Sequence, residues 1–238
     1  MKVELLDHMG SDLDVVNAAR VSFDKESEWD HKELSGGRFM GGQYVWGLHE
    51  RDARLISYLA YHNHWSPFSH QFIKFRVKAP MFVARQLAKH QVGFAWNEVS
   101  RRYVDSDPEF FEPKTWRKRA ENVKQGSSDE GVNTELIEYM EDEGGCIYFP
   151  SEIYERSIST YRALLKLGVC PEQARIVLPQ STYTEWIWTG SLYAWSRMFN
   201  LRVDPHTQQE TREVAVTIGK LIEPLFPVSW KVLTDEPE

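Results

Sequence analysis

Residues 84–103 carry a high density of polar side chains that can do chemistry. Four cationic residues, Arg85, Lys89, Arg101 and Arg102, lie beside His90, three amides, a glutamate and a serine. Guanidinium groups bind phosphates through paired hydrogen bonds, and amides supply the donors and acceptors that a base requires. The stretch therefore indicates a site for a nucleoside monophosphate. Composition alone also allows a solvated helix face followed by a polar loop, because charge runs are usually surface.

A strand, a helix and a loop are expected to position this stretch. Residues 71–77 are rich in β-forming side chains and predict a strand. Pro80 suits the first turn of a helix, and the chain after Gly93 is expected to loop through Asn97 to Tyr103. Helical spacing turns one set of side chains toward the core and another away from it. The first set is Met81, Ala84, Leu87 and Ala88; the second is Arg85, Gln86, Lys89 and His90.

The remaining elements are mostly helical in pattern. Ser11 or Asp12 is expected to cap a first helix that carries Val15, Val16 and Ala19. Apolar spacing and capping residues predict further helices near residues 48–62, 151–167, 171–175, 184–201 and 204–223. Residues 24–45 are polar and Gly-rich and predict a loop. Residues 105–150 are acidic and interrupted by prolines, and predict a long variable excursion with one or two short helices. One strong strand among many helices indicates an α+β fold in one domain spanning residues 1–238.

Composition narrows the class of protein. The chain has 238 residues, 42% hydrophobic and 26% charged, and no apolar run approaches the ~20 residues of a membrane span. The net charge of -7 argues against a general nucleic-acid binder, which needs an excess of cations. Only two cysteines and no leader-like N-terminus are found, so a reduced cytoplasmic protein without a zinc ligand set is expected.

Four motifs in order resemble the flavin-dependent thymidylate synthases. That family has Arg-His-Arg, a gap of seven residues and a serine, inside a run like ARQ…RHR…NE.SxRY. Here the matching residues are Ala84-Arg85-Gln86, His90, Asn97-Glu98, Ser100 and Arg102-Tyr103. The other three matches are HWSPFSH at residues 64–70, ARIVLP at 174–179, and WT at 188–189 followed by NLRVDPHTQ at 200–208. The similarity spans roughly residues 12–225.

The resemblance implies reductive methylation of dUMP, with FAD, NADPH and methylenetetrahydrofolate as the one-carbon donor. It implies helices packed around a small, mostly antiparallel sheet and no metal. Carried over by motif, the residues contacting dUMP are Gln86, Glu98, Ser100, Arg101, Arg102, Arg175 and Arg202. The residues near FAD are His64, Ser66, Ser69, Lys89, His90, Gln91, Val92, Ser191, Arg197 and His206. Among these, Arg202, Ser100 and His90 are the candidates for catalysis.

The role of each candidate has a simpler alternative. Arg175 and Arg202 could be surface or helix-end cations, and His90 a structural hydrogen-bonder. Arg202 is expected to stabilise negative charge that develops on the base. Ser100 has no evident base to activate it, so nucleotide binding is expected rather than nucleophilic attack.

Several positions depart from the family pattern. Lys89 and Gln91 replace the two arginines, the gap to Ser100 holds eight residues, and residues 191–193 replace Asn-Ala-Arg. Those family positions contact the flavin and lie near the folate, so FAD binding could be weaker or arranged differently. The departures leave two alternatives open: a relative that makes another C5-modified nucleotide such as hydroxymethyl-dUMP, or a catalytically dead nucleotide-binding protein.

The family assembles as homotetramers whose active sites lie between subunits, and the resemblance implies the same here. The signature helix, the aromatic segment 182–201 and the last helix appear richer in apolar side chains than one domain needs, which indicates an interface. The alternative is that these aromatic residues form an ordinary core.

Overall fold

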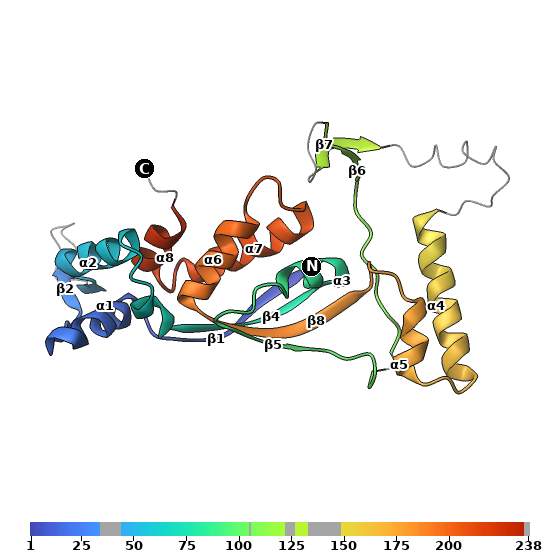
Figure 1. Cartoon of the computed structure of the whole chain (residues 1–238), viewed down its shortest axis with the longest axis horizontal. Helices are drawn as coiled ribbons and strands as arrows, with labels where there is room; N and C mark the ends of the chain where they lie inside the picture. The colour runs from blue at the N-terminus through green and yellow to red at the C-terminus, as the bar shows by residue number, and fades with distance from the viewer. Residues whose placement is uncertain (34–43, 105, 122–126, 133–148, 236–238) are drawn as a thin grey trace, which may run out of the picture.

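A four-stranded antiparallel sheet forms the centre of the computed structural model, which describes residues 1–33, 44–104, 106–121, 127–132 and 149–235. The strand order is β1 (Lys2–Met9), β4 (Phe72–Pro80), β8 (Tyr183–Ser191) and β5 (Phe94–Glu98) (Figure 1). The α+β class and the antiparallel sheet are thereby confirmed. The expectation of one strong strand was too low, because β1, β5 and β8 were not anticipated.

Side-chain alternation explains why β4 and β8 are strands. In β4, Ile73, Phe75 and Val77 are fully buried, whereas Arg76 points to solvent on the other face. The pairing places Phe75 opposite Trp188 of β8. A period of two with one buried face specifies both the strand and its register.

The prediction of one helix over residues 184–201 was wrong. This segment divides into strand β8 and helix α6 (Leu192–Arg202). Trp186, Trp188 and Trp195 are at most 1% exposed, so its aromatic side chains form core. The segment therefore cannot supply the exposed apolar surplus that was expected there.

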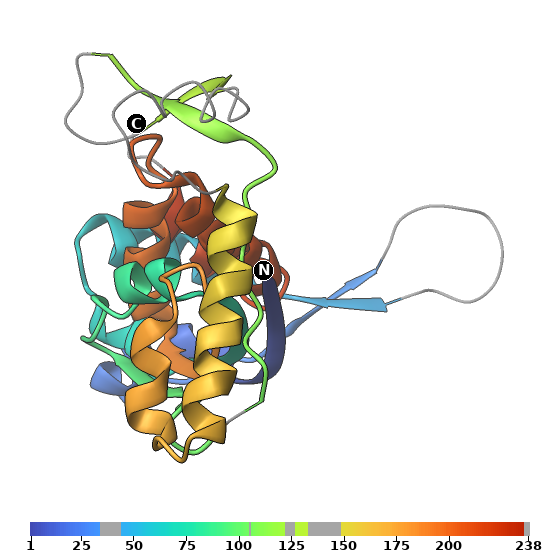
Figure 2. The same cartoon turned by 90° about the vertical axis from the view of Figure 1, so that its right-hand side faces the viewer.

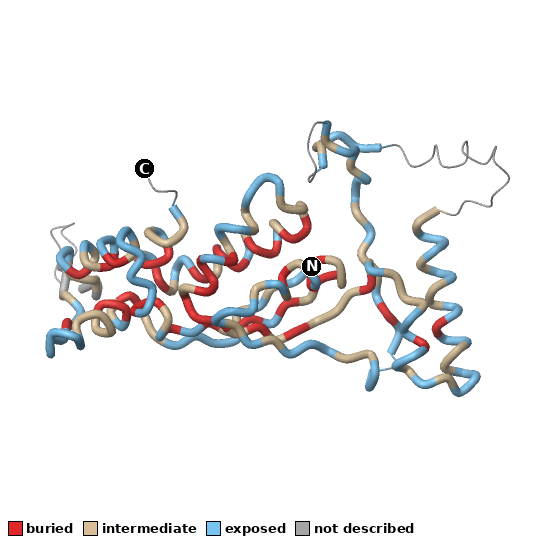
Figure 3. The backbone as a smooth tube through the Cα atoms, viewed as in Figure 1, coloured by how far each residue is buried: buried red, intermediate tan, exposed pale blue. Residues whose placement is uncertain are grey.

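Helices cover one face of this sheet, as Figures 1 and 3 show. They are α3 (Met81–Leu87), α6, α7 (Gln209–Ile222) and α8 (Pro227–Thr234). Helices α1 (Asp12–Arg20) and α2 (Glu50–Tyr61) lie at one end of the sheet and share the same hydrophobic cluster through Val15, Val16 and Ile56. The predictions for α1 and α2 are confirmed, whereas α7 begins at Gln209 rather than near Asp204, and α8 was missed.

Helix α4 (Pro150–Lys166) and the short α5 (Pro171–Ala174) stand at the opposite end (Figures 1 and 2). The predicted helix starting near Ser151 is confirmed, and Gly168, with φ of 86°, follows its end. Tyr161 is the single buried residue of α4. Most of this long helix is thus uncovered within one chain.

Two segments expected to lack strands contain hairpins. Strands β2 (Asp30–Glu33) and β3 (Tyr44–Gly47) pair within the predicted loop 24–45, of which residues 34–43 lie outside the described structure. Strands β6 (Trp116–Arg119) and β7 (Ser127–Val132) pair within the predicted excursion. Its residues 105, 122–126 and 133–148 are likewise outside the described ranges. Strand β6 is too cationic to show the apolar alternation by which strands are recognised.

The signature stretch also differs from expectation. Helix α3 ends at Leu87, so Lys89 and His90 follow the helix instead of lying on its face. The chain turns at Gly93, where φ is 80°, and then forms β5 where a loop was expected. A Cβ at Gly93 would lie 2.8 Å from the Cβ of Ala194. This close approach, and the positive φ, require glycine between α3 and β5.

Candidate functional site

Arg202, at the end of α6, joins two residues of the signature stretch. Its Nε donates to Nε2 of His90 at 2.9 Å, and its Nη2 donates to the carbonyl oxygen of Gln86 at 2.9 Å. The Gln86 amide in turn donates to Oε1 of Gln208, just before α7, at 2.5 Å. Three of the predicted site residues, Gln86, His90 and Arg202, therefore form one hydrogen-bonded cluster with Gln208, and we call these four residues the Arg202 cluster.

The surroundings of His90 favour its neutral form. Burial, followed by the charges of Arg202 and Arg197, lowers the pKa of His90 from 6.5 to about 4. A neutral imidazole can accept the Arg202 hydrogen bond at Nε2, which places its proton on Nδ1. Burial also lowers the pKa of Arg202, but a guanidinium stays charged at neutral pH. The pair is thus one cation held by one neutral acceptor.

A cavity of about 810 Å³ lies against this cluster, and we call it the Arg202 cavity. Its volume is within the range of small-molecule sites. It is lined by Gln86, Arg117, Ser127, Asn200, Leu201, Arg202, Asp204, His206, Thr207 and Gln208. Of these, Arg117 and Ser127 come from the β6–β7 hairpin and were not predicted as site residues. Their segment is acidic overall and offered no motif.

A second group of predicted residues gathers at the end of β5. The Glu98 carboxylate accepts from Thr184 at 2.6 Å, and Arg101 donates to the Ser106 carbonyl at 2.8 Å. These residues line a cavity of about 490 Å³, the Arg175 cavity, together with Arg85 and Arg175. Arg85 belongs to the ARQ motif but was not assigned a role. Its place on the cavity wall makes it a further candidate for anion binding.

Ser100 and Arg102 lie in the turn after β5. The Ser100 hydroxyl accepts from Arg102 Nε at 3.0 Å and from its backbone N–H at 3.3 Å. Within the described part of the chain, no His or carboxylate hydrogen-bonds to this hydroxyl. Its geometry matches a binding group rather than an activated nucleophile.

One chain divides the predicted nucleotide site between two cavities. Arg85 and Gln86 are consecutive on α3 and so differ by about 100° around the helix. Arg85 lines the Arg175 cavity, whereas Gln86 lines the Arg202 cavity. Among the described residues, none lines both. Arg175 and Arg202, which were expected to hold one nucleotide, therefore line different cavities of the same chain.

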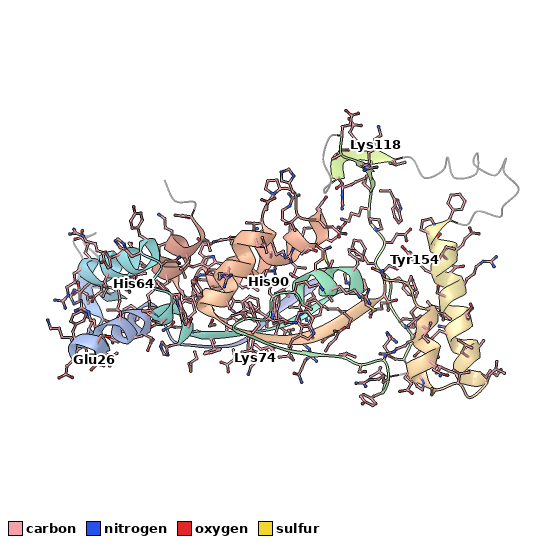
Figure 4. The ribbon with its side chains drawn as sticks, in the orientation of Figure 1. Glu26, His64, Lys74, His90, Lys118 and Tyr154 are labelled. Carbon is pink, nitrogen blue, oxygen red and sulfur yellow. The ribbon has the colours of Figure 1, made fainter. Side chains whose placement is uncertain are left out.

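The predicted flavin residues are also separated. Figure 4 shows His64 at the α1–α2 end of the molecule and His90 above the middle of the sheet. His64 sits beside exposed aromatic residues, with ring centroids 6.1 Å from Tyr58. Ser66 and Ser69 belong to the same turn, the 3₁₀ segment Ser66–Ser69. A single cofactor reaching all these residues and His206 would have to span different parts of the chain.

The other predicted flavin residues, among them the departures Lys89, Gln91 and Ser191, fall into two environments. Lys89, Gln91 and Val92 are exposed, and Arg197 is exposed beside the Tyr193 ring at 5.9 Å. Ser191 is 5% exposed, and its hydroxyl accepts from Ala194 N at 3.2 Å as the N-cap of α6. The Ser191 hydroxyl is thus engaged in starting a helix rather than presented to a cavity.

Neither a metal cluster nor a membrane span is found in the described ranges. These ranges contain no group of three or more His, Cys, Asp or Glu side chains placed to hold a metal ion. No helix within them is long and apolar enough to cross a bilayer.

Known proteins resemble this chain over most of its length. The model of the family described as "Thymidylate synthase complementing protein" matches residues 4–228. Proteins named flavin-dependent thymidylate synthase from Kosmotoga olearia and Thermus thermophilus are each 36% identical, over 96% of this chain and 88% and 73% of theirs. A solved structure of a UMP/dUMP methylase, PolB from Streptomyces cacaoi with 5-Br dUMP, superimposes with a TM-score of 0.72 at 29% identity. That match covers 98% of this chain and 94% of PolB.

Proposed function

Because the chain belongs to the family of thymidylate synthase complementing proteins, we propose that it methylates dUMP to dTMP. The flavin is FAD, NADPH reduces it, and methylenetetrahydrofolate donates the one-carbon unit. The observation that carries the proposal is the family match over residues 4–228, together with a fixed arginine at a cavity where the motifs expect the nucleotide.

The Arg202 cluster explains how the protein assists this reaction. Bound reduced flavin supplies the reducing equivalent, and the chain must orient and polarise the uracil. His90 and the Gln86 carbonyl together fix the Arg202 guanidinium beside the cavity. A cation held in place before reaction stabilises negative charge that develops on the base at little reorganisation cost. His90, being neutral, acts as the positioning residue for Arg202.

Division of the site favours an oligomer with shared active sites. In a homotetramer, the Arg175 cavity of one chain can face the Arg202 cavity of another and complete one nucleotide pocket. Exposed apolar residues near the end of β5 and around α5 support a covered surface there: Tyr103 is 79%, Leu167 80% and Ile176 77% exposed. Light scattering tests this: a 27.8 kDa monomer that turns over dUMP would contradict it.

A reducing, cytoplasmic location also fits. Cys170 is free and exposed, which suits a compartment that keeps thiols reduced.

The decisive experiment measures both cofactor and product. Purified protein is supplied with FAD, passed through gel filtration, and incubated with NADPH, methylenetetrahydrofolate and dUMP tritiated at C5. We expect flavin absorption to co-elute with protein, tritium to be released, and mass spectrometry to identify dTMP. A hydroxymethyl product would indicate the other C5 modification, and retained dUMP without flavin or tritium release would indicate a dead relative.

UMP is a second candidate acceptor. The structural neighbour PolB is named a UMP/dUMP methylase, and its complex with 5-Br UMP superimposes with a TM-score of 0.74 over 98% of this chain. The same tritium assay with UMP tests this, and the ratio of kcat/KM for the two nucleotides gives the discrimination at the 2′ position.

A further inference from the structure

The β6–β7 hairpin is tied to the body of the protein at its base. The backbone N–H of Phe111 donates to the Ser181 carbonyl at 2.8 Å, and that of Tyr183 donates to the Glu109 carbonyl at 2.8 Å. These bonds join the segment before β6 to the start of β8. Figure 1 shows the hairpin rising from this point at the sheet end near α4 and α7.

Arg117 makes a second attachment, to the first turn of α7. Its Nη2 lies 2.9 and 3.0 Å from the two Glu210 oxygens, and its Nε donates to Ser127 at 2.7 Å. The side chains of Arg117 and Glu210 are 18% and 7% exposed. These contacts fix the guanidinium plane. Within the described ranges, Nη1 of Arg117 has no hydrogen-bond partner, so one edge of the cation remains available.

Arg117 stands where two cavities meet. Arg117, Ser127 and Gln208 line both the Arg202 cavity and a smaller pocket of about 300 Å³. We call the smaller one the aromatic side pocket. Its other lining residues include Phe82, Phe111, Pro113, Trp116 and Tyr154.

The aromatic walls of this side pocket are held in place by their neighbours. Phe82 and Phe111 pack edge to face with ring centroids 5.7 Å apart, and Tyr154 stacks on Phe110 at 5.2 Å. Trp116 is 38% exposed, so part of its ring is open to contact with a ligand. The Ser181 hydroxyl also lines the pocket and is buried without a hydrogen-bond partner in the described structure. Figure 4 places Tyr154 of α4 and Lys118 of the β6–β7 hairpin at the same end of the molecule, away from His64.

These walls suit a ligand that joins a flat ring to an anion. Aromatic side chains bind flat rings by stacking and edge contacts, and a fixed guanidinium binds carboxylate or phosphate. We propose that the aromatic side pocket binds the ring-and-anion tail of a cosubstrate, with the ring near Phe111 and Trp116 and the anion on Arg117. The inference rests on the proposed function, because two exchanging cosubstrates of that reaction carry such a tail in addition to the resident FAD.

Two cosubstrates share this chemistry. Methylenetetrahydrofolate ends in a benzoyl ring followed by glutamate carboxylates, and NADPH ends in an adenine close to a phosphate. In either case the reacting ring would lie in the Arg202 cavity while the tail passes between Arg117, Ser127 and Gln208. The nucleotide dUMP also joins a ring to an anion, but in the proposed pocket Arg175 and Arg202 hold it, so its affinity should be independent of Arg117.

The test separates the cosubstrates by half-reaction, using flavin-loaded full-length protein with Arg117→Met and Trp116→Ala. Anaerobic stopped-flow over a range of NADPH concentrations gives the apparent Kd for flavin reduction. Reoxidation of the reduced protein at saturating dUMP, over a range of methylenetetrahydrofolate concentrations, gives that of the folate. Calorimetry gives the Kd of dUMP. Arg119→Met is the matched control, because Arg119 is an exposed cation of the same strand outside both cavities.

We expect Arg117→Met to raise one cosubstrate Kd by roughly 10- to 100-fold, as for loss of a charged hydrogen bond, while dUMP affinity and the Arg119→Met variant stay at wild type. The cosubstrate that weakens identifies the tail. Trp116→Ala, which leaves the Arg117–Glu210 pair intact, must weaken the same cosubstrate, and Arg117→Lys must restore part of the loss. These variants keep the test valid if Arg117→Met does not fold.

Other outcomes would overturn the inference. Both cosubstrate Kd values within twofold of wild type in folded Arg117→Met or Trp116→Ala would do so. An equal loss of dUMP and cosubstrate affinity would mean that Arg117 only holds the hairpin in place. Wild-type protein that accepts no electrons from NADPH would instead defeat the proposed function itself, and this inference with it.

Discussion

Replacing Arg202 by glutamine tests whether His90 and Arg202 act as one unit. In the structure, Arg202 donates to His90 at 2.9 Å, and its charge is one of the causes that lower the pKa of His90 to about 4. Glutamine removes the charge and the rigid donor fork. Burial, the largest cause, remains. The pKa of His90 should therefore rise in Arg202→Gln while staying below 6.5.

The magnitude follows from linkage. Between pH 6.5 and about 4 the unfolded chain binds a proton at His90 that the folded chain does not, so the free energy of unfolding falls as pH decreases through this window. A pKa displaced that far corresponds to at most about 3 kcal/mol. Because His90 is only half-buried, solvent screening should reduce this to about 1 kcal/mol. In Arg202→Gln the pH dependence should be shallower.

Nucleotide affinity gives an independent measure of the same substitution. A hydrogen bond to a charged group contributes about 1.5–3 kcal/mol, so the Kd of dUMP should rise by roughly 10- to 150-fold. Arg54→Gln, which removes an exposed arginine of α2, should change neither the pKa of His90 nor the Kd of dUMP.

The assay is a histidine-selective NMR titration, with His90 assigned from His90→Gln, combined with calorimetry of dUMP. Wild-type His90 should titrate well below 6. A pKa near 6.5 for His90 in the wild-type protein would refute the coupling between His90 and Arg202. So would a variant Arg202→Gln in which both the pKa of His90 and the affinity for dUMP are unchanged.

Three further substitutions have defined outcomes. Gly93→Ala places a Cβ 2.8 Å from Ala194 at a φ of 80°, so urea denaturation should show a loss of at least about 1 kcal/mol; an unchanged midpoint would contradict this. Asp12 is 3% exposed and accepts hydrogen bonds from two backbone amides of α8 at 2.9 Å. Asp12→Ala should therefore lower the free energy of unfolding by roughly 2 kcal/mol on the same assay, and a decrease below about 0.5 kcal/mol would show that the cap is dispensable. Ser100→Ala should still release the C5 proton of dUMP, more slowly; complete loss with intact dUMP binding and flavin reduction would restore the nucleophile hypothesis.

The sequence predicted best the helices whose patterns are local. Helices α1, α2 and α4 have apolar side chains at helical spacing, and each was expected within a few residues of its bounds. Strand β8 was mistaken for helix because its alternating Trp186 and Trp188 run directly into the aromatic residues of α6. Short aromatic runs fit both periods, and pairing with β4 and β5 decides between them.

The site was predictable as a set of residues but not as an arrangement. Motifs identified Gln86, His90 and Arg202, and the structure brings these together. They could not show that Arg175 faces another cavity, because this depends on where the segment after α5 packs against the rest of the chain. Arg117 could not be found at all, since its partner Glu210 lies 93 positions away and neither belongs to a motif. Such a pairing is set by tertiary packing alone.

The departures from the family signature have a structural pattern that bears on their meaning. His90, the residue retained from the Arg-His-Arg triplet, is the one engaged with Arg202, whereas Lys89 and Gln91 on either side are exposed. Substituting an exposed residue leaves internal hydrogen bonds unchanged and alters contacts with ligands or other subunits. We therefore expect the changed residues to affect how the cofactor is held, while the hydrogen bonds that fix Arg202 are preserved. A protein that had lost catalysis would have no need to keep the guanidinium of Arg202 fixed by a neutral histidine, so this pattern favours an active enzyme with altered flavin affinity.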